Sequence, residues 1–111
     1  MKTPLQILKD GRQLLIDKGW TQGTYAKDIH GDYIDPAGSD AACFCGHGAI
    51  YAAGGYRGVG TPPGNVAQAE LALNAAIQDA HFPAFNDAPG RTVEEVLAKF
   101  DEAIAAVEAA Q

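Results

Sequence analysis

Glycine and proline placement constrains the fold of this chain more than any other feature of its sequence. The chain has 13 glycines and 6 prolines. These residues end helices and mark turns, and many of them gather in residues 21–38, 58–64 and 82–90. The segments between those stretches carry apolar residues at helical spacing. The pattern therefore predicts an all-α fold of four helices with structured connections.

The first predicted helix has clear signals at both ends. Thr3 suits the N-cap, Pro4 suits the first helical position, and Gln6 completes a capping-box pattern. Gly19 fits the left-handed position that closes a helix, and we expect Trp20 to fold back onto the last turn, near Leu15. The predicted apolar stripe consists of Leu5, Leu8, Leu15 and Ile16, widened by Ile7 and Leu14.

The second predicted helix spans residues 40–53 and is capped by Ser39. It is built from small residues, and each glycine in a helix costs up to about 1 kcal/mol relative to alanine. Close approach of a neighbouring backbone would compensate for this cost, so we expect this helix to be the central and most enclosed one. Gly54 and Gly55 are expected to end it.

Capping patterns also place the third and fourth helices. Asn65, followed by Gln68, is the predicted N-cap of the third, which should end around residues 81–83. Its apolar positions are Val66, Ala69, Leu73, Ala76, Ile77 and Ala80. Thr92 and Glu95 form a strong capping box for the fourth. The apolar face of that helix consists of Val96, Leu97, Phe100, Ile104 and Val107.

The connections between these helices are long enough to hold structure of their own. Residues 24–26 and 33–34 are β-prone, which predicts either a small β-hairpin with its turn near residues 29–32 or an ordered loop. Residues 82–90 are predicted to form a loop. We therefore expect a single domain over residues 1–111, folded as a compact four-helix orthogonal bundle.

Charge and hydropathy exclude several classes of protein. The formal net charge is −6, and the lysines and arginines are scattered singly, which argues against nucleic-acid binding. No stretch approaches the roughly 20 apolar residues that span a bilayer, and the N-terminus does not resemble a signal peptide. Cys43 and Cys45 lie too close together for an unstrained disulfide, so reduced thiols and a cytoplasmic location are expected.

Several short motifs together resemble a known family. They are Gly19-Trp20-Thr21 with Gly23, the loop with Asp28, Gly31 and Pro36, Cys45 before Gly48-Ala49-Ile50, and Phe85-Asn86-Asp87 followed by Arg91-Thr92 and Glu95-Val96. The chain is similar to a family of small, uncharacterised bacterial and bacteriophage proteins, classed only as a domain of unknown function. That family usually has tryptophan where this chain has Phe85. The resemblance implies a helical fold and a bacterial or phage origin, but no activity, cofactor or catalytic residue.

Cysteine and histidine side chains suggest two kinds of chemistry. Cys43, Cys45 and His47 are residue types that bind zinc, but three ligands on one straight helix would not converge on a metal, so no metal site and no cofactor are predicted. The enzyme alternative is a cysteine-dependent hydrolase or transferase in which Cys45 or Cys43 acts with His81 or His47. The simpler interpretation is that both cysteines are small buried apolar residues.

The preferred hypothesis is a non-enzymatic binding or interaction module, such as a phage or prophage accessory protein. Its ligand would be a small polar or nucleotide-like molecule, or its partner would be a protein; a homodimer through the glycine- and alanine-rich helix is one option. The candidate ligand-binding residues are Trp20, His47, Asn86, Asp87 and Arg91. We expect them to border one concavity, with Arg91 contacting an anionic group. The alternative is that Asn86 and Asp87 only hold a turn and that the loop aromatics, Tyr25 among them, seal the core.

Overall fold

A computed structural model describes residues 1–77 and 82–111. The described fold is mostly helical, with four main helices, one short helix and a two-stranded antiparallel sheet. In chain order the elements are α1 (Pro4–Asp17), β1 (Ala26–Lys27), β2 (Cys43–Phe44), α2 (Gly46–Gly54), α3 (Gly64–Ile77), α4 (Phe82–Asp87) and α5 (Val93–Ala109). None of the described helices is long and apolar enough to cross a membrane.

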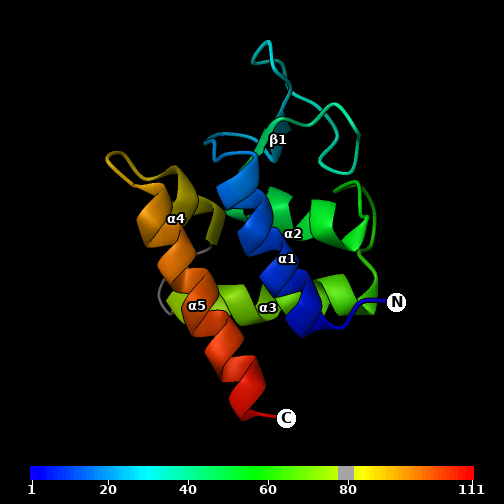
Figure 1. Cartoon of the computed structure of the whole chain (residues 1–111), viewed down its shortest axis with the longest axis vertical. Helices are drawn as coiled ribbons and strands as arrows, with labels where there is room; N and C mark the ends of the chain where they lie inside the picture. Colours follow the sequence, from blue (N-terminus) through cyan, green and yellow to red (C-terminus); the bar gives the residue numbers. More distant parts are fainter. Residues whose placement is uncertain (78–81) are drawn as a thin grey trace.

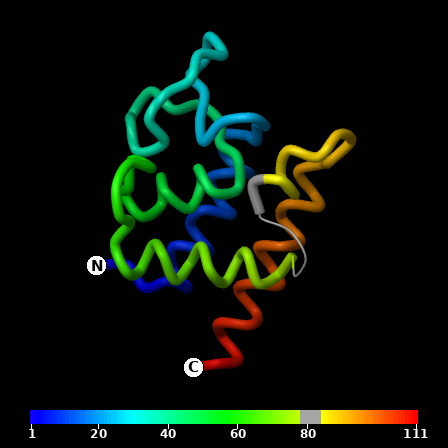
Figure 2. The backbone as a smooth tube through the Cα atoms, turned by 180° about the vertical axis from the view of Figure 1, so that it is seen from behind, coloured from blue at the N-terminus to red at the C-terminus, as the bar shows by residue number. Residues whose placement is uncertain are grey.

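The helices pack around one core (Figure 1). α1 packs against both α2 and α5, and α3 crosses behind α1 and α5 while contacting them both. Seen from the other side, the segment between α1 and α2, residues 18–45, projects at one end of the molecule and is called the excursion below (Figure 2). The end of α5 projects at the other end. The compact helical arrangement agrees with the prediction, whereas several boundaries do not.

α1 and α5 begin where the capping patterns predicted. The Thr3 hydroxyl accepts a hydrogen bond from the backbone N–H of Gln6. The Gln6 side chain donates to Asp10 instead of bonding back to Thr3, so Thr3 is the N-cap as predicted, but the predicted capping box at this helix is wrong. At the start of α5, Thr92 and Glu95 bond reciprocally, each side chain accepting from the backbone N–H of the other. In α1 the buried stripe consists of Ile7, Leu8, Gly11 and Leu15. Ile16, which was predicted to belong to that stripe, is 51 % exposed, so this part of the prediction is wrong.

The predicted start of the second helix is also wrong. Residues 43–44 form strand β2, and α2 begins at Gly46 with Cys45 as its N-cap, not at residue 40 with Ser39. The reason is pairing with a distant segment: Ala42 N–H donates to the Lys27 carbonyl, and Cys45 N–H donates to the Tyr25 carbonyl. These hydrogen bonds stabilise an extended backbone at residues 42–45. Residue propensities do not predict them, because the partners lie far away in the sequence.

The segment between α1 and α2 contains only part of the predicted hairpin. Ile34 N–H donates to the Ala26 carbonyl, and Lys27 makes an isolated bridge with Tyr33, so a turn does form between them. The main partner of β1, however, is β2, in the register Ala26 to Phe44 and Lys27 to Cys43. The turn itself is fixed by Asp28, whose carboxylate accepts from the N–H groups of His30 and Asp32.

Two further boundaries differ from the predictions. α3 begins at Gly64, one residue before its predicted cap. The Asn65 Nδ2 donates to the Lys2 carbonyl, and its Oδ1 accepts from the Val66 N–H. The predicted end of α3 at residues 81–83 includes His81, which lies outside the described residues, as does Ala80. The predicted loop over residues 82–90 contains the short helix α4, which long-range bonds from Asn86 hold in place, as described below.

α2 is the most enclosed helix, as its small residues predicted. Residues 46–51 and 53 of this helix are all buried. Gly48 shows why a small residue is needed there: an added Cβ would lie 1.8 Å from the carbonyl oxygen of Tyr25. The compensating neighbour is therefore the strand-like backbone at Tyr25. Gly54 is the last residue of α2, and Gly55 closes it in the left-handed conformation, as predicted.

Candidate ligand-binding site

Asn86 joins three distant parts of the chain. Its side chain is completely buried, and its Oδ1 accepts hydrogen bonds from Trp20 Nε1 at 2.7 Å and from the Gly46 N–H at 3.0 Å. Its Nδ2 donates to the Thr21 carbonyl at 3.1 Å and to Asp87 Oδ1 at 2.9 Å. All the hydrogen-bonding capacity of this amide is therefore used inside the protein, which makes Asn86 a structural residue.

The same contacts place Trp20. Its backbone forms a parallel bridge with Phe44, and its ring is half-buried and packed against the core. The indole N–H is satisfied by Asn86, as a buried tryptophan requires. Trp20 thus ties the segment after α1 to both β2 and α4.

Asp87 lies beside this junction, and its side chain is exposed. Its Oδ1 accepts from the Gly23 N–H at 3.0 Å as well as from Asn86. The amide of Gln22 reinforces the same contact by donating to the carbonyls of Asn86 and Ala88. Within the described residues the second oxygen, Oδ2, has no hydrogen-bond partner, so the carboxylate is held in place while one oxygen stays available.

A cavity of about 300 Å³ opens at this point. Its described lining residues come from three segments: Gly23, Thr24, Tyr25, Cys45 and Asp87. The volume is at the small end of the range for small-molecule sites. Its walls combine an aromatic ring, a thiol, a hydroxyl and a carboxylate, so the cavity offers both apolar contact and hydrogen bonding.

Cys45 is one of the residues that line the cavity and is only 7 % exposed. Its sulfur accepts a hydrogen bond from the Gly48 N–H at 3.3 Å and so caps α2. Burial raises the pKa of the thiol to about 11, and the nearby Asp87 carboxylate acts in the same direction. A nucleophilic cysteine needs the thiolate form, which this environment disfavours.

His47 lies on the side of α2 that faces α3. Its Nε2 is 3.2 Å from Asn74 Oδ1, and its Nδ1 is 3.7 Å from Glu70 Oε2. The ring is 5 % exposed and lies near Tyr51. Burial, followed by the charge of Glu70, raises the pKa of the Tyr51 phenol. His47 therefore belongs to a polar cluster between two helices, and it is not among the described residues that line the cavity.

The Arg91 side chain links α4 to α5. Its Nε donates to the Phe85 carbonyl at 2.8 Å, and its guanidinium stacks over the Phe85 ring at 3.7 Å. It also forms an ion pair with Glu95 at 3.0 Å. Of the five residues predicted to border one concavity, the structure brings Trp20, Asn86 and Asp87 together, and only Asp87 is among the described lining residues.

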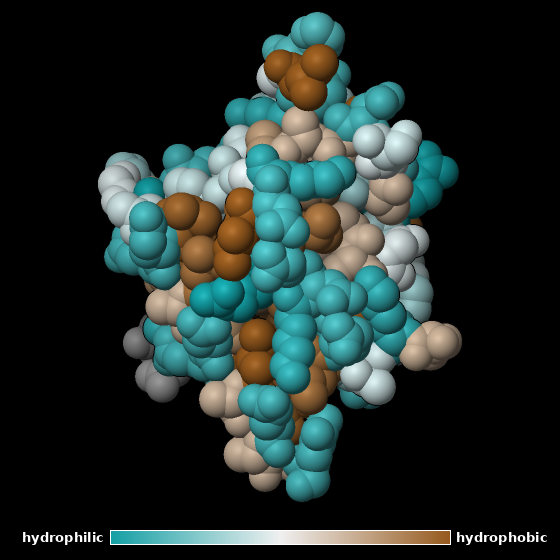
Figure 3. Space-filling model, viewed as in Figure 1, coloured by the Kyte–Doolittle hydropathy of each residue, from teal (hydrophilic) through white to brown (hydrophobic). Residues whose placement is uncertain are grey.

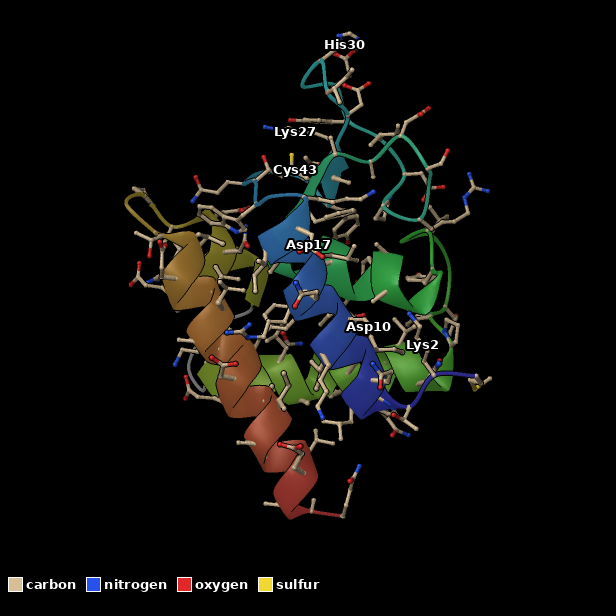
Figure 4. The ribbon with its side chains drawn as sticks, in the orientation of Figure 1. Lys2, Asp10, Asp17, Lys27, His30 and Cys43 are labelled. Atoms are coloured by element: carbon tan, nitrogen blue, oxygen red, sulfur yellow. The ribbon has the colours of Figure 1, made fainter. Side chains whose placement is uncertain are left out.

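The cysteine and histidine side chains are arranged differently from the predicted single helix. Cys43 lies in β2 and Cys45 at the cap of α2, and both thiols are free. Figure 4 shows His30 at the apex of the excursion, away from Cys43. Among the described residues, which leave out His81, no group of three or more His, Cys, Asp or Glu side chains could hold a metal ion.

Most of the cavity-lining residues were not predicted as ligand-binding residues. Gly23, Thr24 and Tyr25 reach the cavity because their segment lies beside residues 43–45 through backbone hydrogen bonds. The sequence contained one partial signal, since Tyr25 was among the loop aromatics expected either to line a cleft or to seal the core. The sequence suggested a nucleophile, a metal ligand or a small buried apolar residue for Cys45, and its role as the N-cap of α2 was not predicted.

Comparison with known proteins gives a family but no activity. No curated protein and no solved structure matches the chain. A family model described as a family of unknown function, DUF6197, matches residues 1–106. Because this match covers nearly the whole chain, the protein belongs to the DUF6197 family of unknown function.

Proposed function

We propose that this protein is a non-enzymatic binding module whose small-molecule ligand occupies the cavity between residues 23–25, Cys45 and Asp87. The observation that carries the proposal is the Asp87 carboxylate at the cavity wall. One of its oxygens is fixed by Gly23 and Asn86, and the other has no partner within the described residues. A polar group that is held rigidly at a partly apolar cavity is typical of a ligand site.

The rigidity of the surrounding wall supports the same proposal. The Tyr25 ring packs edge-on against Tyr51 at 5.0 Å, and Gly58 lies beside it. The backbone of Tyr25 is also bonded to Cys45. A wall that is already ordered does not lose conformational entropy when a ligand binds, which favours affinity.

The state of Cys45 supports binding over catalysis. With a pKa of about 11, the thiol is protonated at neutral pH, and its sulfur is already engaged by the N–H of Gly48. The cysteine-dependent hydrolase or transferase is therefore the weaker candidate. The setting we propose is a bacterial or phage accessory role in the cytoplasm, supported by the motifs of the family resemblance and by the free thiols of Cys43 and Cys45.

Native mass spectrometry of protein purified from its host tests the proposal. We expect a bound small molecule that is lost in Thr24→Phe, because the larger side chain fills the cavity. Thr61→Phe is the matched control, since Thr61 is exposed in the connection between α2 and α3 and is not among the described lining residues. Absence of any bound molecule, or equal binding by both variants, would contradict the proposal.

A further inference from the structure

The charge of the cavity wall limits the chemistry of its ligand. Asp87 is the one charged residue among the described lining residues, which otherwise are Gly23, Thr24, Tyr25 and Cys45. The whole chain also carries a formal net charge of −6. An anionic ligand would be repelled by this carboxylate, and a cationic ligand would be attracted to it.

A helix N-terminus near the cavity would favour an anion, but the donors described next are already used. The Gly46 N–H donates to Asn86 Oδ1, and the Gly48 N–H donates to Cys45 Sγ. The Ala49 N–H donates to the Cys45 carbonyl inside the helix. Because these backbone donors of α2 have partners, the helix end cannot offer them to a phosphate or carboxylate.

The arginine that the sequence suggested for an anion is also occupied elsewhere. Arg91 bonds to the Phe85 carbonyl and to Glu95, and its guanidinium covers the Phe85 ring. Contact with an anion would require these interactions to break. The features that would normally recognise an anion are therefore engaged in the fold.

The remaining polar side chains of the described wall include a carboxylate, which only accepts, and the Thr24 hydroxyl, which can accept or donate, beside an aromatic ring. Asp87 Oδ2 and Thr24 Oγ1 make no hydrogen bond within the described residues, so both are available to a donor. The ring of Tyr25 is 40 % exposed and is held in place by Tyr51. A carboxylate together with an aromatic face is the combination that binds an organic ammonium group, through a charge-assisted hydrogen bond and a cation–π contact.

We infer that the ligand of this cavity is a small organic cation, a protonated primary amine with an apolar or aromatic body. This inference rests on the proposed function and assigns its ligand class. The ammonium group bonds to Asp87 Oδ2 and Thr24 Oγ1, and the apolar body packs against Tyr25 and Cys45. The cavity of about 300 Å³ limits the ligand to a small molecule.

The proposed ligand site is separate from the hydrophobic surface at the apex of the excursion. Figure 3 shows a brown patch at this apex, where Ile29 is 82 % exposed. That patch lies on the turn that follows β1, whereas the cavity lies between residues 23–25 and α4. Asp32, on the same turn, is exposed and provides a control carboxylate outside the described cavity lining.

A matched series of probes tests the charge of the ligand. Binding of 2-phenylethylamine, 2-phenylethanol and 3-phenylpropionate to the protein is followed by amide NMR shifts of residues 23–25, 45 and 87. We expect the amine to bind at least about tenfold more tightly than the alcohol, because a hydrogen bond to a charged group is stronger than a neutral one. The carboxylate is expected to bind most weakly.

Asp87→Asn is the decisive variant because an asparagine can keep both hydrogen bonds that Oδ1 accepts from Gly23 and Asn86. It removes the charge and replaces the Oδ2 acceptor by an amide NH2, while the fold is preserved. The affinity for the amine should therefore fall at least about tenfold, because the ammonium group loses both the charge and the acceptor. The affinity for the alcohol should change much less, because its hydroxyl can accept from the new amide. Asp32→Asn removes the same charge at the apex and should leave amine binding unchanged. Thr24→Val, which removes the second acceptor, should weaken the amine independently.

The outcomes separate this inference from the proposed function. If the alcohol or the carboxylate binds at the same amides as tightly as the amine, or if Asp87→Asn leaves amine binding unchanged, the cation inference is overturned and the binding module stands. If none of the three probes shifts the amides of the cavity at millimolar concentration, and the protein from its host carries no bound molecule, both fail.

Discussion

Replacing Gly48 by alanine puts a methyl group where the carbonyl of Tyr25 already lies. The new Cβ would be 1.8 Å from the oxygen and 2.6 Å from the carbonyl carbon. These are backbone atoms, so no side-chain rotation relieves the overlap. α2 and the segment at Tyr25 must separate by more than an ångström, which strains or breaks the hydrogen bond from the Cys45 N–H to that same carbonyl.

The expected cost follows from three effects. Overpacking of an enclosed site costs about 1–3 kcal/mol, and a lost hydrogen bond costs about 1 kcal/mol. Alanine regains up to about 1 kcal/mol of helix propensity relative to glycine. The net destabilisation is therefore about 2 kcal/mol, which for a domain of this size corresponds to a decrease of roughly 10 °C in Tm.

Urea and thermal unfolding, followed by circular dichroism, measure this difference. Gly64→Ala is the matched control, because Gly64 begins α3 and an added Cβ there meets no atom within 4 Å. We expect the control to be as stable as the wild-type protein or slightly more stable. If Gly48→Ala is as stable as Gly64→Ala, the inference that the backbones of α2 and Tyr25 approach closely is wrong.

Three further substitutions or modifications test separate parts of the structure. Thr92→Ala should lower the free energy of unfolding by about 1 kcal/mol in urea melts, because it removes the acceptor of the capping box; a midpoint unchanged relative to the wild-type protein would refute this. Asn86→Ala should cost about 3 kcal/mol or more, since it leaves the Trp20 indole and the Gly46 N–H without their partner; Asn65→Ala, at a half-buried position, should cost much less. The Cys45 thiol should react with iodoacetamide about 100-fold more slowly than an unperturbed thiol of pKa 9.0 at pH 8, because a pKa of about 11 lowers the thiolate fraction by that factor. Peptide mapping by mass spectrometry measures this rate, and equal labelling of Cys45 in the folded and the urea-unfolded protein would contradict its burial.

Local signals in the sequence determined the parts of the fold that depend on neighbouring residues. The N-cap of α1 and the capping box of α5 join residues three positions apart, so Thr3 and Thr92 could be assigned without knowledge of the fold. The apolar face of α5 and the small residues of α2 likewise predicted which surfaces are enclosed. The apolar stripe of α1 was predicted only in part, because Ile16 is exposed.

The tertiary structure decided the features that join distant segments. Asn86 bonds to Trp20 across 66 residues and to Gly46 across 40 residues, and these bonds hold α4 in place and position Asp87. Residues 43–45 pair with residues 25–27, so they form a strand and its end where a helical turn was predicted. The same pairing places Tyr25 beside Cys45 at the cavity wall. A hydrogen bond between distant segments depends on the path of the whole chain, so the sequence supplied the residues of the cavity, and only the tertiary fold brought them to one wall.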